Sequence, residues 1–432
     1  MKRKVLILIV LLITWSSIIY AQKILTLKEC YDMALSSTAL AAEKGAYTNI
    51  SQLKDDNLAK AWLPTLDANG SFLYNSSVID IGSALGSLPI AGIASAIKPL
   101  PHDQYKITLD INQVIYDGGA TKSARAMEKA ELGVNEKQTD IDLYKIRGQI
   151  NNYYFSILLL DRQKDLLIIY LEIINKRLKS MQSAMNNGVI LKTDIDVLSS
   201  EKIKLEQQLN ENGIKKSALL GNLEDITGSK IDSVTGFILP EQTVESNTEI
   251  TRPEIQAFDL RKEQLSTGLQ VIQSKRLPKA FGFATLGYGM PPGSNFFETS
   301  FKPYFVLGAG IKWNIIDWNK VKNEKHIVIL QKEIIENRKT DLTADLKRLL
   351  ELKNAEIASL KVLIETDSEL IAMRKRITAA AESQYLNGTI TATDYLNELN
   401  SERQTVVNNE IHKINLAMAR IEYMNISGKE IE

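Results

Sequence analysis

The feature that most constrains this chain is a sequence repeat at a spacing of 200 residues. Residues from its middle recur 200 positions later without a gap, and the pairs include Ile111 and Ile311, Asp117 and Asp317, Gly188 and Gly388, Asp194 and Asp394, and Gly228 and Gly428. A duplication of this size predicts two copies of one structural unit that pack against each other. We therefore expect a first repeat over 22–228 and a second over 252–428.

The first 21 residues are predicted to be an export signal. A basic start, Lys2-Arg3-Lys4, precedes an apolar run over 5–13, and Ala21 is a plausible cleavage position. A retained membrane helix is the alternative, but the apolar run is short for one. No later run of 18 apolar residues occurs, so the mature chain should cross a membrane, if at all, through strands that alternate apolar and polar residues.

Four segments show that alternation, at about 65–75, 105–116, 281–289 and 304–316. Each has about the length of a tilted bilayer-crossing strand. The predicted lipid-facing residues are Ile107, Leu109, Ile111, Leu307, Ile311 and Trp313, and the predicted lumen-facing residues are Lys106, Thr108, Asp110 and Asn112. Two soluble hairpins in an α+β domain remain an alternative. Four strands cannot close a barrel, so a spanning role requires several chains.

The rest of the mature chain is predicted to be helical. The expected helices are 26–62, 118–187, 191–227, 253–277, 318–387 and 391–427, which contain few or no internal prolines. A helix of ~70 residues would be about 105 Å long, so these helices should form coiled coils or walls. Heptad spacing links Leu198, Leu205 and Leu219, with Asn212 interrupting the stripe.

Each long helix pair is predicted to reverse at a glycine, within the tip hairpins 186–194 and 385–394. An Asn-Gly pair at Gly188 and at Gly388 suits the left-handed conformation that ends a helix. Thr193-Asp194 and Thr393-Asp394 are then expected at the N-caps of the returning helices. The tips could be simple turns, or they could form the end of an assembly where entry is regulated.

Composition argues against several other functions. The formal net charge is zero, with 52 basic and 52 acidic residues, so no nucleic-acid partner is expected. The histidines His102, His326 and His412 are scattered, and no catalytic, metal or cofactor pattern accompanies them. The single cysteine, Cys30, is expected to be a buried helix residue. We therefore expect no enzyme and no cofactor.

Short motifs in order along the chain resemble the TolC-like outer-membrane efflux proteins, the outer membrane factor family. The segment 25–35, Leu-Thr-Leu-Lys-Glu-Cys-Tyr-Asp-Met-Ala-Leu, resembles the opening helix of the family. Thr251-Arg252-Pro253-Glu254 resembles the start of its second repeat, and 188–194 and 385–396 resemble its tip turns.

The resemblance implies a mainly α fold with a membrane β-barrel portion. In such a homotrimer, twelve strands form the barrel in the outer membrane of a Gram-negative bacterium, above a long periplasmic α-helical barrel. It implies contact with outer-membrane lipid, and partnership with a periplasmic adaptor (membrane fusion protein) and an inner-membrane transporter. It also implies that the linker 229–251 forms an equatorial segment, followed at the chain's end by a short tail, 429–432.

Site residues follow from the same resemblance. The adaptor-docking tip turns match Gly188, Val189, Gly388 and Thr389, and the entrance gate matches Asp194, Tyr385 and Asp394. An arginine that often completes the gate is replaced by Ile390, so its charge is missing or supplied elsewhere. Asp394 could line the mouth or could only cap its helix.

Two functions are therefore open. The first is an outer-membrane exit duct of a tripartite efflux or type I secretion system, which works by gated passive diffusion. The second is a non-transporting periplasmic coiled-coil or adhesion protein attached to the envelope. Drug, metal and protein substrates are not distinguished.

Overall fold

The computed structural model describes residues 24–80, 98–186, 191–232, 234–243, 249–295 and 297–431. The predicted signal over 1–21 and the predicted tip residues Gly188 and Val189 lie outside these ranges. The chain divides into two compact units, and each takes segments from both predicted repeats. We call them the helical unit (up to residue 44, 137–256 and 339–432) and the sheet unit (45–136 and 257–338).

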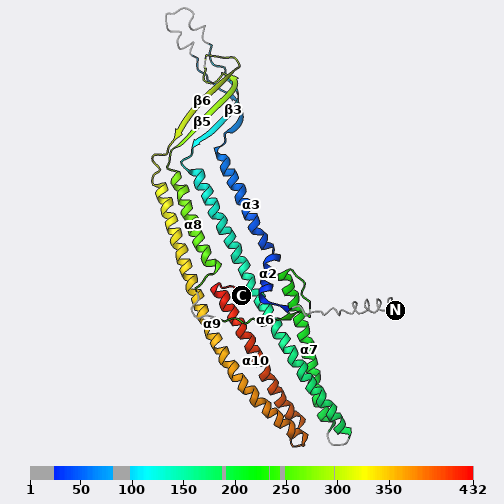
Figure 1. The fold of residues 1–432 in the computed structure, drawn as a ribbon. Helices are drawn as coiled ribbons and strands as arrows, with labels where there is room; N and C mark the ends of the chain where they lie inside the picture. The colour runs from blue at the N-terminus through cyan, green and yellow to red at the C-terminus, as the bar shows by residue number, and fades with distance from the viewer. Residues whose placement is uncertain are drawn as a thin grey trace, which may run out of the picture. The chain divides into compact units, whose positions relative to one another are not determined.

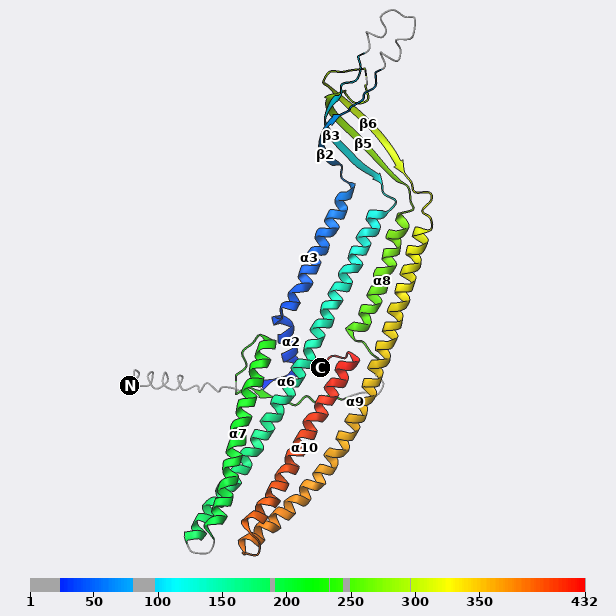
Figure 2. The same cartoon turned by 180° about the vertical axis from the view of Figure 1, so that it is seen from behind.

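The chain is mainly helical, as the sequence predicts (Figures 1 and 2). The helices are α2 (Leu27–Ser37), α3 (Ala39–Ala59), η1 (Lys60–Trp62), α6 (Ala120–Asn186), α7 (Lys192–Thr227), α8 (Pro253–Ser274), α9 (Lys320–Leu386) and α10 (Ala392–Ser427). The prediction of one unbroken helix over 26–62 is wrong. Thr38 has an extended backbone, with φ −71° and ψ 138°, and separates α2 from α3.

The sheet unit contains a four-stranded antiparallel sheet in the order β2-β3-β5-β6. Its strands are β2 (Thr65–Tyr74), β3 (Asp103–Tyr116), β5 (Lys279–Met290) and β6 (Lys302–Lys312). The predicted end of the last strand at 316 is wrong, because β6 pairs only with β5 and the register ends at Lys279 opposite Lys312. In the helical unit, β1 (Ile24–Leu25) pairs in parallel with β4 (Gly236–Phe237).

Local geometry matches at several positions that lie 200 residues apart. Asp117 and Asp317 each accept a hydrogen bond from the amide four residues later, at 2.6 and 3.1 Å. Gly228 and Gly428 each end a helix with a left-handed backbone, φ 64° and 87°. Glycine suits this conformation because it has no Cβ. The shared residues therefore occupy the same local roles just before α6 and α9, and just after α7 and α10.

A buried cluster in the helical unit joins α2, α6, α7 and α10 around Cys30 and Tyr154. The Tyr154 hydroxyl lies 2.9 Å from the Leu25 carbonyl and 2.7 Å from the Ile238 carbonyl, so it connects α6 to β1 and to the residue that follows β4. Cys30 is fully buried, as predicted, and burial raises the pKa of its thiol to about 12. Within the described residues, no helix is both long and apolar enough to cross a bilayer.

Candidate functional site: the helical tips and the faces of the sheet

The second tip, between α9 and α10, is a tight turn built around Gly388. Gly388 has φ 73°, its amide donates to the Tyr385 carbonyl at 3.0 Å, and the Thr389 amide donates to the Gln384 carbonyl at 3.0 Å. These two bonds form the Schellman motif that closes a helix C-terminus. The side chain of Thr389 donates to the same Gln384 carbonyl at 2.9 Å, which further fixes the turn.

The returning helix α10 begins with a capping box. Its N-cap is Thr391, not the predicted Thr393-Asp394 pair, and Asp394 is the third residue of the helix. The Thr391 amide and hydroxyl donate to the Asp394 carboxylate at 3.0 and 2.7 Å, and the Asp394 amide donates back to the hydroxyl at 3.2 Å. The side-chain and then the backbone hydrogen bonds from Thr391 lower the pKa of Asp394. The prediction of caps at 193–194 and 393–394 is therefore wrong by about one turn, because the capping box needs its acid three residues inside the helix.

The first tip repeats part of this arrangement. Asp194 lies in the first turn of α7, and the Leu191 amide donates to its carboxylate at 3.3 Å. Leucine offers no oxygen for the reciprocal bond, so Asp194 makes fewer capping contacts than Asp394.

Tyr385 lies close to this end of the helical unit and has a buried hydroxyl. That hydroxyl has no hydrogen-bond partner in the part of the chain that the structure describes. Burial and then the charge of Asp194 raise its pKa. The ring stacks on Tyr395, with centroids 5.7 Å apart and an interplanar angle of 13°. A buried donor without a partner costs about 1–3 kcal/mol.

Arg177 supplies a positive charge near the tips that the sequence did not predict. Arg177 of α6 forms an ion pair with Glu382 of α9, and its guanidinium lies 5.4 Å from the ring centroid of Tyr395 of α10. We call these three residues the first staple. Helix periodicity alone could not have found it, because its members come from three helices that are far apart in sequence.

A second arginine makes an equivalent set of contacts further along the same helices. Arg403 of α10 lies 3.6 Å from the buried carboxylate of Glu201 of α7 and 6.0 Å from the ring centroid of Tyr170 of α6. We call these three residues the second staple. Both staples join the α6–α7 hairpin to the α9–α10 hairpin within one chain.

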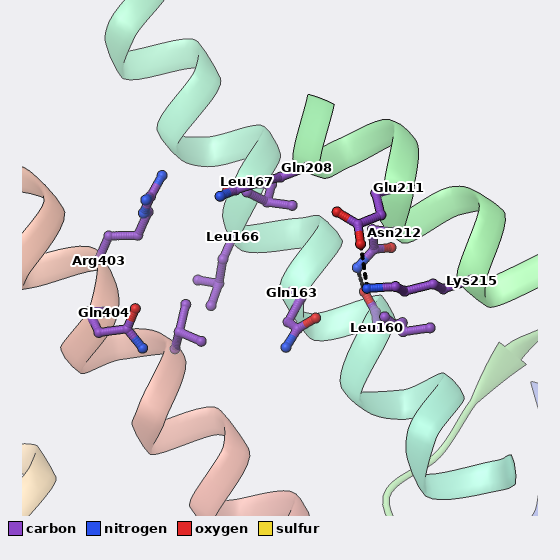
Figure 3. A pocket seen from close by; sticks show the side chains of 11 residues that line it. Leu160, Gln163, Leu166, Leu167, Gln208, Glu211, Asn212, Lys215, Arg403 and Gln404 are labelled. Atoms are coloured by element: carbon purple, nitrogen blue, oxygen red, sulfur yellow. Dashed lines mark hydrogen bonds and ion pairs between the residues drawn. The ribbon is translucent and has the colours of Figure 1, made fainter. Parts of the chain in front are cut away.

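A cavity of about 250 Å³ lies beside the second staple, between α6, α7 and α10 (Figure 3). Its polar lining includes Gln163, Gln208, Arg403 and Gln404. Asn212, which interrupts the predicted apolar stripe, is buried there and donates to the Leu160 carbonyl at 3.1 Å. The contact between these helices is therefore partly polar, with Asn212 inside it.

The strand register of the sheet unit places Lys106, Thr108, Asp110 and Asn112 on one face of the sheet. Asp110 is the centre of a hydrogen-bond network there. Its carboxylate accepts from the Asn69 amide at 2.8 Å and from the Thr108 and Thr285 hydroxyls at 2.8 and 2.6 Å. This polar face therefore links β2, β3 and β5 through one acid.

Aromatic rings lie over glycines on the same polar face. A Cβ added at Gly287, Gly308 or Gly310 would collide with the ring of Tyr304, Phe283 or Phe281, respectively. Each of these glycines therefore allows a ring to lie close to the backbone of the sheet, and any larger residue would push that ring away.

The opposite face of the sheet is almost entirely apolar. Ile107, Leu109, Ile111, Leu307 and Ile311 share it, and Ile107, Leu307 and Ile311 are 69%, 78% and 77% exposed. Trp313 was predicted to be a strand residue of this face. It lies one residue beyond β6, and its indole donates to the Arg276 carbonyl at 3.0 Å.

Aromatic residues gather near both ends of the strands. Near one end, Tyr105 lies 5.0 Å from Phe72 and 5.9 Å from Phe301, measured between ring centroids. Near the other end, Trp62 and Trp313 are exposed. Such belts on both sides of an apolar band are typical of membrane interfaces.

The described residues contain no group of three or more metal-ligating side chains. His412, one of the three scattered histidines, lies 2.6 Å from the Asp367 carboxylate, between α10 and α9. This pair joins two helices of one hairpin.

No protein-family model and no curated protein match the sequence, but solved structures match the fold. CusC, described as forming a transmembrane channel, is 11% identical with a TM-score of 0.69, over 94% of this chain and 92% of that one. The outer membrane protein VceC of Vibrio cholerae is 15% identical with a TM-score of 0.66, over 94% and 97%. The MtrE outer membrane channel of Neisseria gonorrhoeae, in its open state, is 13% identical with a TM-score of 0.65, over 94% and 89%.

These likenesses extend over nearly the whole of each chain. The chain therefore has the fold of outer-membrane channel proteins, the TolC-like fold that its motifs resemble.

Proposed function

We propose that this chain forms a homotrimeric exit duct in the outer membrane of a Gram-negative bacterium. In this proposal the duplicated chain contributes four strands to a twelve-stranded barrel and two helix hairpins to a periplasmic helical barrel. The observation that carries the proposal is the sheet with one apolar, exposed face and one polar face. It is supported by a fold shared with channel proteins.

The edges of the sheet support closure by several copies. β2 and β6 are its outer strands, and each pairs with one neighbour within the described residues. Unpaired strand edges are costly in a bilayer, and a closed barrel removes them. The apolar face then meets lipid, and Lys106, Thr108, Asp110 and Asn112 face a water-filled lumen.

The tips are the proposed entrance. Tyr385 carries a buried hydroxyl that has no hydrogen-bond partner among the residues that the structure describes, and the charge of Asp194 acts on it. We assign Asp194 as the acceptor in the closed trimer. Asp394 is committed to its capping box, so its contribution to the mouth is its negative charge rather than a free hydrogen-bonding group.

The proposed partners follow from this topology. A periplasmic adaptor docks on the tip turns, at Gly188, Val189, Gly388 and Thr389, and links the duct to an inner-membrane transporter. The transporter supplies the energy, and the duct is not an enzyme. Its mechanism is gated passive diffusion within a tripartite efflux or type I secretion system.

Reconstitution into a planar bilayer tests the proposal. A trimer purified from the outer-membrane fraction in detergent should give stepwise single-channel currents. A water-soluble monomer, or a membrane-bound protein that never conducts, would instead favour the adhesion or coiled-coil function. Asp110→Asn serves as a probe variant, because removal of a lumenal carboxylate should lower cation selectivity without preventing insertion.

A further inference from the structure

The polar face of the sheet is not uniform across its four strands. Residues directly opposite each other in an antiparallel pair lie on the same face, so the strand register identifies the members of this face. On β2 and β3 its central members are polar, namely Thr65, Asp67, Asn69, Thr108, Asp110 and Asn112. On β5 and β6 its central members are mainly apolar, namely Phe281, Phe283, Tyr304 and Val306. One half of the face therefore presents hydrogen-bonding groups and charge, and the other half presents rings.

Phe281 and Phe283 form the centre of the apolar half. Their ring centroids lie 6.4 Å apart, with an interplanar angle of 35°. Each ring lies close to a glycine of β6, Gly310 for Phe281 and Gly308 for Phe283. Phe281 is 37% exposed and Phe283 is half-buried. The two neighbouring rings therefore form an accessible surface on which a flat apolar group can stack.

The polar half carries two carboxylates at one level of the sheet. Asp67 of β2 is directly opposite Asp110 of β3, and like charges at such positions are destabilising, so a cation between them would be favourable. Asp110 accepts three hydrogen bonds, whereas the exposed Asp67 makes no hydrogen bond or ion pair within the described residues. Asp110 is opposite Thr285, two residues from Phe283 on β5. It is therefore a diagonal neighbour of Phe283, roughly 7 Å away.

The lysines of this face lie toward its ends and not beside the two acids. They are Lys106, Lys279, Lys302 and Lys312. Lys106 is four residues from Asp110 on the same strand, which corresponds to ~13 Å. This separation exceeds the Debye length of about 8 Å at physiological ionic strength. The middle of the face is therefore locally negative, next to the two rings.

We propose that this face is a contact surface for planar organic cations, whose rings stack on Phe281 and Phe283 and whose positive group lies near Asp67 and Asp110. The proposal rests on the proposed duct, because the face lines a lumen only in a closed barrel. It names a class of cargo by its chemistry. An aromatic cation uses the rings and the acids together, whereas a hydrated metal ion has no apolar surface with which to use the rings.

Open-channel block in a planar bilayer tests this assignment. Ethidium, a planar aromatic cation, should block the wild-type trimer at a lower concentration than tetraethylammonium, a cation without a ring. It should also block at a lower concentration than pyrenesulfonate, a planar aromatic anion. Equal block by ethidium and tetraethylammonium would overturn the role of the rings, and equal block by ethidium and pyrenesulfonate would overturn the role of the acids.

Three variants locate the block on this face. Phe283→Leu keeps an apolar side chain but removes a ring, so it should raise the half-blocking concentration of ethidium about fivefold and leave that of tetraethylammonium unchanged. Phe305→Leu is the matched control, because Phe305 belongs to the opposite face and is 77% exposed; it should change neither value. Asp67→Asn should weaken block by both cations. This variant removes an exposed charge without a partner among the described residues, so it serves even if Phe283→Leu does not assemble.

A binding measurement separates failure of this proposal from failure of the duct. If the trimer conducts and ethidium blocks wild type, Phe283→Leu and Phe305→Leu equally, the proposal is overturned and the duct stands. If no variant conducts, the duct fails, and equilibrium dialysis of ethidium against the detergent-solubilised protein decides. Weaker retention by Phe283→Leu than by wild type and Phe305→Leu would support the stacking surface, and equal retention by all three would overturn it.

Discussion

Arg177→Met isolates the energetic role of the first staple. Methionine keeps an unbranched apolar side chain but removes the ion pair with Glu382 and the cation–π contact with Tyr395. The arginine side chain is 13% exposed and the glutamate 44%, so solvent screening limits the ion pair to about 0.5–1 kcal/mol. The cation–π contact adds about 0.5–1 kcal/mol. The total loss is about 1.5 kcal/mol per chain.

The expected result is a loss of stability. Denaturant unfolding of the detergent-solubilised protein should show a loss of about 1.5 kcal/mol per chain. An unchanged unfolding midpoint would refute this energetic role of the first staple. Lys176→Met is the matched control. Lys176 directly precedes Arg177 in α6, its side chain is exposed, and it forms no ion pair within the described residues.

Three further predictions concern the tips. Tyr385→Phe and Asp194→Ala should each raise the resting conductance of the reconstituted trimer, because each removes one side of the proposed hydrogen bond; an unchanged leak in both would exclude a latch. Gly388→Val should abolish export while trimers still reach the membrane, since a β-branched residue strains a backbone with φ 73°; normal export would mean that this turn is not needed for docking. Asp394 has a lowered pKa in the folded chain, so its contribution to stability is present above the unfolded pKa of about 3.9 and is lost as pH falls through the folded value. Asp394→Asn should therefore flatten the acid limb of a plot of urea midpoint against pH, and an unchanged limb would count against the capping box.

The sequence was a good guide to the long elements. Hydrophobic period and the lack of internal prolines predicted α6, α7, α9 and α10 to within a few residues at each end, because these helices are determined by many residues acting together. Boundaries set by one or two residues were less accurate. The break at Thr38 and the capping box of Thr391 with Asp394 depend on single side chains, which periodicity does not report.

The candidate site was predictable only in part. Gly388, Asp194 and Tyr385 follow from local motifs and the family resemblance. Arg177, Glu382, Arg403 and Glu201 do not, because long-range ion pairs have no sequence signature in a chain with many charges on solvated helix faces. Once the repeat is known, however, comparison of positions 200 apart reveals which of these charges are not duplicated.

The glycines beneath Tyr304, Phe283 and Phe281 affect the inner diameter of the proposed barrel. In the proposed barrel, rings that lie close to these glycines would stay near the wall, and cargo would pass aromatic surfaces as well as the Asp110 network. A methyl group at Gly308 or Gly310 would tilt a ring toward the axis and turn part of that wall into a constriction. In the proposed barrel, three backbone positions per chain, none bearing a side chain of its own, would thus limit how far these rings reach toward the axis.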